Sequence, residues 1–230
     1  GSVEAMRDIG PDRILAAASG LPRDAIVIDG ENITGTAEEV FAAHRQNDVP
    51  TIVGFTRDER FASIGSASTV AEYQTAVRNA FGANADGVLK AYPVKGDDGV
   101  ARAMTDIARD MSVGSQMFNW AVAVRTNGKS PVWAYHFTRR QPYVAGIRFS
   151  DHDPATVGAY HTGEVPYFLR TLDSLNLFRK TRDWTPLDLQ LRDIMSGIIL
   201  SFAKTGTPGP NWPQFDARNP QVMMLGEDVR

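Results

Sequence analysis

The chain has 230 residues, of which 43% are hydrophobic, and a formal net charge of −3 at pH 7. This length and composition suit a folded globular protein with a sizeable core and argue against intrinsic disorder. The small negative charge gives no reason to expect nucleic acid as a partner, the absence of cysteine excludes disulfides and thiolate metal sites, and no apolar run approaches the roughly 20 residues that span a membrane.

The first elements in chain order are two helices and a strand. A helical pattern covers residues 3–19, and a capping box at 36–39 begins a short helix that reaches Gln46. Between them, 25–29 is a short apolar piece that ends in an Asp-Gly turn signal. Residues 51–55 then form an apolar, β-branched run, which is the pattern of a buried strand.

The middle of the chain is predicted to be mainly helical. A capping box at 69–72 begins the first of these helices, and Gly82 provides its stop signal. The last of them is apolar almost all round, which predicts a buried helix. We expect helices at 70–81, 84–92, 97–110 and 115–125, followed by a second convincing strand at 131–138.

The last third of the chain contains a long loop, a long helix and a short strand. About twenty irregular residues follow the second strand, and loops of this length often form the rim or lid of a site. Pro186 suits the first position of the last helix, which Gly206 and Pro208 end. The residues around 212–215 and 222–225 are predicted to form a final packing segment and a short strand.

Only two strands, at 51–55 and 131–138, are strongly predicted. An open parallel sheet needs several neighbouring strands, because each strand must bury both of its faces. We therefore expect an α/β fold whose remaining strands lie outside this chain, in a separate chain or in a cleaved part of the polypeptide. A monomer that folds cooperatively by itself would contradict this expectation.

Two stretches present candidate catalytic side chains. His161 lies in a loop between Gly158 and Gly163, and loops on rigid scaffolds often carry catalytic groups. Asp58 and Glu59 follow the first strand, and the carboxyl end of a parallel strand faces the ligand crevice. A loop histidine by itself is more often a hydrogen-bonded structural residue. An acid that precedes a histidine, however, matches the chain order of an α/β-hydrolase triad.

Three stretches between Ala25 and Asp216 resemble type-B carboxylesterases, the cholinesterase-like branch of the α/β hydrolases. The run that leads to that family's catalytic acid resembles VIDGENITGTAEEVFAAHRQNDVPTIVGFTRDE, residues 27–59. The family's histidine loop is similar to GAYHTGEVPYFL, residues 158–169. The end of its C-terminal helix and the segment that follows resemble SFAKTGTPGPNWPQFD, residues 201–216.

The resemblance implies that residues 1–230 are the C-terminal half of an α/β-hydrolase fold, with helices packed on a mainly parallel sheet. It also implies a carboxylic ester hydrolase that uses a serine together with Glu59 and His161. Glu59 is favoured over Asp58 because the family places its acid second in Asp-Glu, and adjacent residues at a strand exit point in opposite directions.

The family's nucleophile is missing from this sequence. Its serine lies in a Gly-Glu-Ser-Ala-Gly elbow upstream of the acid, and its oxyanion hole comes from a Gly-rich loop further upstream. No serine here fits G-x-S-x-G, and Ser130 comes nearest but lacks the second glycine. The resemblance therefore implies an N-terminal portion of the same hydrolase as partner, a small-molecule ester as substrate, and no cofactor.

The other polar and aromatic candidates receive structural interpretations. We expect Asp58 to be a structural carboxylate bonded to nearby backbone or to Arg57, and Glu164 to support the histidine loop or a water near it. Residues 151–153, Asp-His-Asp, suggest a metal site, but no second cluster has ligand spacing, so we expect no metal. Structural roles are also expected for His44, His136, Phe118, Trp120 and Tyr160. The last three could instead line an acyl or alcohol pocket.

Three functions remain open at this point. The first is a serine carboxylesterase that is active when this chain is assembled with its nucleophile portion. The second is an inactive fragment, and the third is a cholinesterase-like binding module without catalysis. Such modules typically lose a triad residue, so the presence of both Glu59 and His161 favours the enzyme. The substrate and the cellular compartment are left undetermined.

Overall fold

The computed structural model describes residues 2–20 and 26–227, which divide into two compact units at Gln46 and Asn47. The apolar piece predicted from Ala25 begins outside the described residues. The first unit holds three short helices, α1 (Val3–Arg7), α2 (Pro11–Ala18) and α3 (Ala37–Ala42), none of which contains a buried residue.

The prediction of one continuous helix at 3–19 is wrong. The chain breaks between α1 and α2, because a residue that precedes a proline is disfavoured in the helical conformation and Gly10 precedes Pro11. The capping box of α3 is confirmed: the Thr36 side chain accepts from the Glu39 amide at 3.2 Å, and the Glu39 carboxylate accepts from the Thr36 amide at 2.8 Å. This helix ends at Ala42, before the predicted Gln46, and His44 has a positive φ of 53°.

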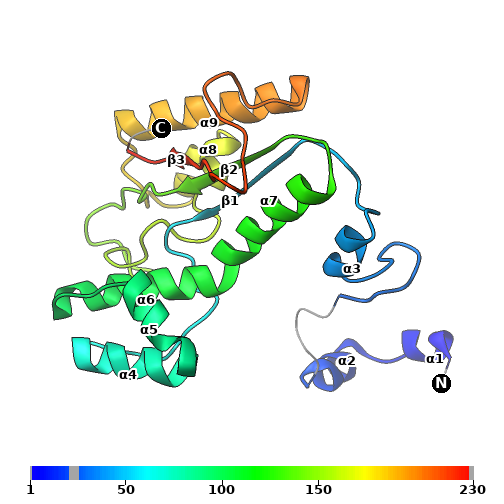
Figure 1. Ribbon diagram of the computed structural model, residues 1–230, viewed down its shortest axis with the longest axis horizontal. Coiled ribbons are helices and arrows are strands. Elements are labelled where there is room, and N and C mark those ends of the chain that lie inside the picture. Colours follow the sequence, from blue (N-terminus) through cyan, green and yellow to red (C-terminus); the bar gives the residue numbers. More distant parts are fainter. Residues whose placement is uncertain (1, 21–25, 228–230) are drawn as a thin grey trace. The chain divides into compact units, whose positions relative to one another are not determined.

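The second unit is built on a parallel sheet of three strands (Figure 1). The strands are β1 (Thr51–Thr56), β2 (Val132–Phe137) and β3 (Met223–Leu225), in the spatial order β1-β2-β3. In their register, Thr51 lies opposite Val132 and Phe137 lies opposite Leu225. Both strongly predicted strands and the short final strand are therefore confirmed.

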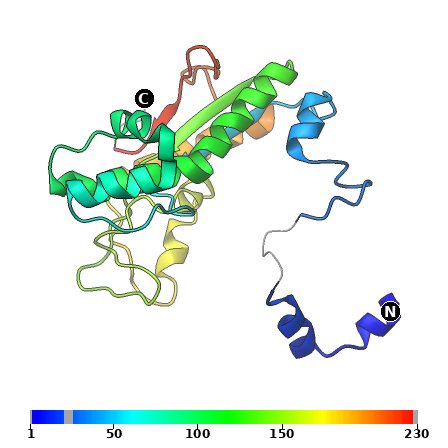
Figure 2. The ribbon, with the colours of Figure 1, turned by 60° about the horizontal axis from the view of Figure 1, so that its bottom comes forward.

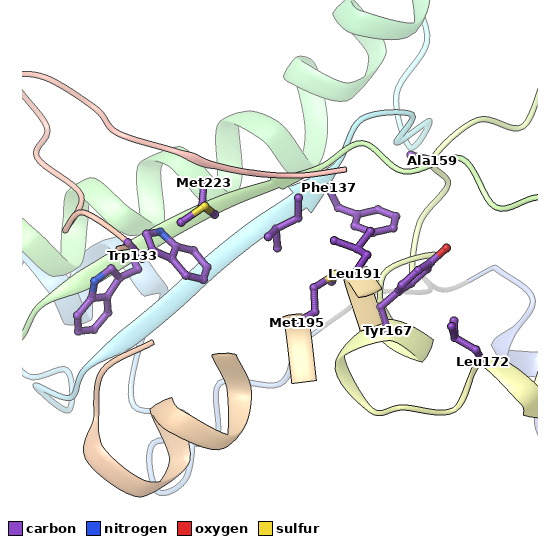
Figure 3. Close-up of a cluster of buried hydrophobic side chains, with 10 residues drawn as sticks. Trp133, Phe137, Ala159, Tyr167, Leu172, Leu191, Met195 and Met223 are labelled. Atoms are coloured by element: carbon purple, nitrogen blue, oxygen red, sulfur yellow. The ribbon is translucent and has the colours of Figure 1, made fainter. Parts of the chain in front are cut away.

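Helices cover both faces of this sheet (Figure 1 and Figure 2). On one face, α9 (Pro186–Thr205) directs Leu191 and Met195 towards Phe137 of β2 (Figure 3). On the opposite face, α7 (Ser115–Asn127) contacts β1 and β2. As predicted, α9 begins at Pro186 and ends before Gly206, whose φ of 72° is left-handed; Thr185 adds a capping box at its start that was not predicted.

The remaining helices of this unit flank these two layers. They are α4 (Val70–Phe81), α5 (Ala85–Ala91), α6 (Val100–Arg109) and α8 (Val165–Phe168). Three of them were predicted, α4 with its observed ends and the other two within three residues of theirs. The helix α8 was not predicted; it has Pro166 in its first turn, where proline is tolerated. None of the helices among residues 2–20 and 26–227 is long and apolar enough to cross a bilayer.

The prediction that 115–125 forms a fully buried helix is wrong within the part of the chain that the structure describes. Ala121 and Val124 of α7 are buried, but Phe118 and Trp120 are each 45% exposed. The reason is that α7 packs on β1 and β2 along one side only. Met117 and Val122 are partly buried, while Phe118 and Trp120 keep large exposed fractions although Phe118 packs against Phe215.

A buried ion pair connects the end of β2 with α9. Arg139 donates to both carboxylate oxygens of Asp188, at 2.7 and 2.9 Å, and Asp188 is fully buried. Tyr167 of α8 donates to the same carboxylate at 2.8 Å, and the Thr185 amide donates at 2.9 Å. Burial alone would raise the pKa of Asp188, but the hydrogen bonds from Arg139, from the hydroxyl and amide of Thr185 and from Tyr167 hold it below its ordinary value.

His136 of β2 is a half-buried histidine with an unsatisfied ring nitrogen. Its ring packs against Phe55 with 4.7 Å between centroids, and its buried Nε2 has no hydrogen-bond partner within the part of the chain that the structure describes. Burial, followed by the positive charge of Arg109, lowers the pKa of His136 from 6.5 to about 4, while Asp110 and Asp106 act in the opposite direction.

We expect this histidine to make the fold acid-sensitive. Between pH 6.5 and about 4 the unfolded chain binds a proton at His136 and the folded chain does not. The contribution of the neutral His136 to the free energy of unfolding is therefore fully present above pH 6.5 and is lost as the pH falls towards about 4. The loss should be on the order of 3 kcal/mol. Urea unfolding at several pH values should give a shallower pH slope for His136→Gln than for the unsubstituted protein. Parallel slopes would contradict this assignment.

Candidate active site

The carboxylate of Glu59 is positioned by the end of β1. The strand stops at Thr56, and the chain turns so that the Thr56 amide donates to Oε1 of Glu59 at 3.2 Å. The residue is only 2% exposed. One oxygen is thus fixed by the backbone, and the other is free to meet a partner from elsewhere in the chain.

That partner is His161, which lies 102 residues further along. Its Nδ1 is 2.9 Å from Oε2 of Glu59, and its side chain is 55% exposed. The loop that presents it has left-handed backbone on both sides, with φ of 72° at Gly158 and 65° at Thr162. Phe61 packs edge-on against the imidazole, with 4.7 Å between the ring centroids.

This pairing determines what the imidazole can do. When Nδ1 carries the proton and donates it to Glu59, Nε2 has a lone pair and can accept a proton from another group. A buried carboxylate also stabilises the imidazolium that would then form. Among residues 2–20 and 26–227, no side-chain hydroxyl is bonded to the His161 ring. The two predicted residues therefore meet in the geometry of a base and its orienting acid, without a nucleophile from the described chain.

Asp58 makes no hydrogen bond to the imidazole and is also buried. Its carboxylate accepts from the Ala159 amide at 2.6 Å and pairs with Arg57 at 3.2 Å and with Arg102. Burial acts to raise the pKa of Asp58, but the hydrogen bonds from Arg102 and Ala159 outweigh it, and the pKa lies below its ordinary value. The bonds to backbone and to Arg57 are those expected of a structural carboxylate.

Glu164 lies close to the pair but does not bond to the imidazole. Tyr135 donates to its Oε1 at a long 3.4 Å, and its Oε2 is buried without a partner within the described chain. Burial, together with the negative charge of Glu59, raises the pKa of Glu164. The hydrogen bond from Tyr135 comes from β2, so the support of the histidine loop that we expect of Glu164 stays a prediction.

An open pocket of about 370 Å³ adjoins His161. The irregular residues after β2 form much of its wall, as the predicted rim loop would, and Tyr160 lines it whereas Phe118 and Trp120 do not. The lining residues are Asp58, Arg60, Phe61, Asp151, His152, Asp153, Thr156, Val157, Tyr160 and His161.

The Asp-His-Asp stretch in this wall is occupied by internal hydrogen bonds. His152 bonds to Asp151 through Nδ1 and to the Tyr143 hydroxyl through Nε2, both at 3.0 Å. Asp153 accepts from the Ala155 amide at 2.9 Å. Among the residues that the structure describes, no group of three or more histidine or carboxylate side chains is arranged to hold a metal ion.

Arg102 and Phe61 are neighbours of the site that the sequence patterns did not indicate. Arg102 has Asp106 four residues later in α6, which is the pattern of an ordinary surface ion pair. Its contact with Asp58 spans 44 residues, and nothing in the local pattern indicates it. Phe61 follows the acid closely, but its contact with His161 depends on the fold of both loops.

The fold and the site together define the class of the protein. Helices on a parallel sheet, with an acid and a histidine at the carboxyl ends of neighbouring strands, are typical of an α/β hydrolase. A family model described as "Carboxylesterase family" matches residues 13–230. The chain therefore belongs to the carboxylesterase family.

Individual relatives agree with this assignment. The chain is 28% identical to fumonisin B1 esterase of Sphingopyxis macrogoltabida over 214 residues, which cover 88% of this chain and 37% of that protein. It is 24% identical to para-nitrobenzyl esterase of Bacillus subtilis (strain 168), covering 88% and 39%. A solved PNB esterase structure superposes with a TM-score of 0.65 at 20% identity, covering 99% and 47%. The α/β-hydrolase fold is thus confirmed, and the chain spans less than half the length of these relatives.

Proposed function

We propose that this chain is the C-terminal portion of a serine carboxylesterase and supplies the acid, Glu59, and the base, His161. The observation that carries the proposal is the 2.9 Å contact between Glu59 Oε2 and His161 Nδ1 at the ends of two neighbouring parallel strands. Family membership supports ester hydrolysis as the reaction.

The proposed reaction is an acyl transfer in two steps. Nε2 of His161 takes the proton of a serine hydroxyl as the serine oxygen attacks the ester carbonyl, and the resulting imidazolium is stabilised by Glu59. The same proton then passes to the departing alcohol, which leaves an acyl-serine. A water, deprotonated by His161 in turn, attacks the carbonyl of the acyl-serine, and the imidazolium returns that proton to the serine oxygen as the acid is released.

The serine and the oxyanion hole are proposed to come from an N-terminal portion of the same hydrolase. The outer edge of β1 has no strand partner among residues 2–20 and 26–227, and its unpaired backbone groups suit another strand. Phe118 and Trp120 of α7 expose apolar surface that a further layer would cover. The matched relatives are also more than twice as long as the stretch that this chain matches.

The substrate is proposed to be a small-molecule ester without further definition. The relatives' names refer to fumonisin B1 and to para-nitrobenzyl esters, which are chemically unlike each other. The pocket beside His161 contains both charged and aromatic side chains, and its lining does not favour one of these two kinds of ester over the other.

Intact mass spectrometry of the natural protein, before and after treatment with a fluorophosphonate, tests this proposal. Fluorophosphonates react with activated serines, so we expect one adduct on a serine outside these 230 residues, in the same polypeptide or in an associated one. An adduct on a serine of this chain would contradict the division of the triad. An unlabelled protein would instead favour an inactive fragment or a binding module.

A further inference from the structure

We propose that Asp58 is a positioning residue that fixes the histidine loop against the end of β1, and so sets the distance between His161 and Glu59. This inference rests on the proposed function, because it concerns the same pair of side chains. It assigns a catalytic consequence to a carboxylate that does not touch the imidazole.

The first observation is a pair of hydrogen bonds between Asp58 and Ala159. The Asp58 amide donates to the Ala159 carbonyl at 3.0 Å, and the Ala159 amide donates to the Asp58 carboxylate at 2.6 Å. Asp58 directly precedes Glu59, and Ala159 lies two residues before His161. The two loops are therefore joined immediately before each functional side chain.

The second observation is the close approach of the two segments of the chain at Asp58 and Gly158. Gly158 has a φ of 72°, and a side-chain carbon at this position would overlap the carboxylate of Asp58. Ala159 is 1% exposed and lies within the core cluster (Figure 3). Glycine is therefore needed at 158 both for its backbone angle and for space.

The third observation is that Asp58 is itself held in place. Arg102 pairs with one carboxylate oxygen and Arg57 with the other. Arg102 is fixed in turn by Asp106, at 2.8 Å. Because both oxygens are used and the group is buried, the carboxylate cannot rotate away from the Ala159 amide without losing charge-assisted hydrogen bonds, which are the stronger kind.

The catalytic consequence follows from how sensitive acyl transfer is to geometry. A misplacement of about 1 Å in a reacting group can lower a rate by roughly 10²-fold. Loss of the Asp58 carboxylate would release the histidine loop at Ala159 and let His161 move relative to both Glu59 and the attacking serine. Asp58 also lines the pocket beside His161, but both of its carboxylate oxygens are bonded to protein groups, so we expect KM to change much less than kcat.

A matched control exists at the opposite end of the same two strands. Asp48 precedes β1 and accepts from the amides of Lys129 and Ser130, which precede β2, both at 2.9 Å. It therefore also joins the two strands through a carboxylate and backbone amides, but it does so away from the histidine loop and at an exposed position. Asp48→Ala reports whether losing a carboxylate bridge between these strands lowers kcat by itself, and Asp58→Asn, which keeps the side-chain volume, controls for the burial of Asp58.

The test compares Asp58→Ala, Asp58→Asn and Asp48→Ala in the full-length enzyme that contains this chain, with p-nitrophenyl acetate as substrate. We expect Asp58→Ala to lower kcat by about 10²-fold with little change in KM. Asp58→Asn should lose less, because its side-chain oxygen can still accept from Ala159. Asp48→Ala should retain kcat. The pH dependence of kcat/KM should shift for the Asp58 variants alone, since their His161–Glu59 contact is altered.

The proposal is overturned if the Asp58 variants match Asp48→Ala in kcat and in pH profile, or if KM rises and kcat does not fall. Should Asp58→Ala fail to fold, Asp58→Asn decides the matter, because it keeps the volume of the side chain. His161→Ala belongs in the same series. If that variant remains active, the proposed function itself fails, whereas an inactive His161→Ala beside fully active Asp58 variants refutes only the positioning role.

Discussion

Replacing His161 by alanine in the full-length enzyme should lower kcat by about 10⁶-fold, because the triad acts as a unit and no base then takes the serine proton during the attack. Glu59→Gln should lower kcat by about 10⁴-fold, since the amide can favour the wrong imidazole tautomer. Both effects far exceed that expected for Asp58. The difference reflects the contact itself: Glu59 bonds to the imidazole at 2.9 Å, whereas Asp58 reaches it only through the backbone of Ala159.

Steady-state hydrolysis of p-nitrophenyl acetate measures these losses, and the rate of fluorophosphonate labelling gives an independent reading of serine activation. His44→Asn is the matched control, because His44 is exposed in the first unit and its φ of 53° is one that asparagine adopts readily. It should leave kcat unchanged. Residual activity of Glu59→Gln within tenfold of the unsubstituted enzyme would remove Glu59 from the proposed mechanism.

The second large effect concerns stability. Arg139→Met should lower the free energy of unfolding by about 3–5 kcal/mol, because it leaves the fully buried carboxylate of Asp188 without its counter-charge. The remaining donors, Tyr167 and Thr185, cannot replace two charge-assisted hydrogen bonds. Urea unfolding followed by tryptophan fluorescence measures the loss, and Trp184, which packs against Tyr167, lies close to the pair.

Arg192→Met provides the comparison for that stability measurement. Arg192 pairs with Asp193 at 2.9 Å, but this carboxylate is half-exposed and solvated. An exposed ion pair of this kind contributes about 0–1 kcal/mol. Equal losses for the two variants would show that the burial of Asp188 does not govern the strength of its pair with Arg139.

Sequence patterns predicted those parts of the fold whose determinants are local. The capping boxes that begin at Thr36 and Thr69 and the start of α9 at Pro186 all form as expected, because each involves residues within one helical turn. The strands were found because continuous β-branched runs are typical of parallel sheets. The acid and the histidine were located through their order relative to these strands and through the family resemblance.

Most of what was missed depends on contacts that no local pattern contains. The pairing of Arg102 with Asp58, and that of Arg139 with Asp188, join residues 44 and 49 positions apart. The exposure of Phe118 on α7 depends on which other elements are present to cover the helix, and an apolar pattern does not report that. The break before Pro11 was a local signal that the helical pattern at 3–19 obscured.

The strand order β1-β2-β3, which repeats the order of the strands along the chain, bears on how the protein is made. A ribosome adds about 5–20 residues per second, so β2 leaves it roughly 4–16 s after β1, and β3 follows later still. Each new strand can dock on the edge of one already exposed, without any strand having to insert between two others. Sheet assembly in this unit can therefore proceed during translation, in the direction of synthesis. The histidine loop is synthesised before β3, which then pairs with the free edge of β2.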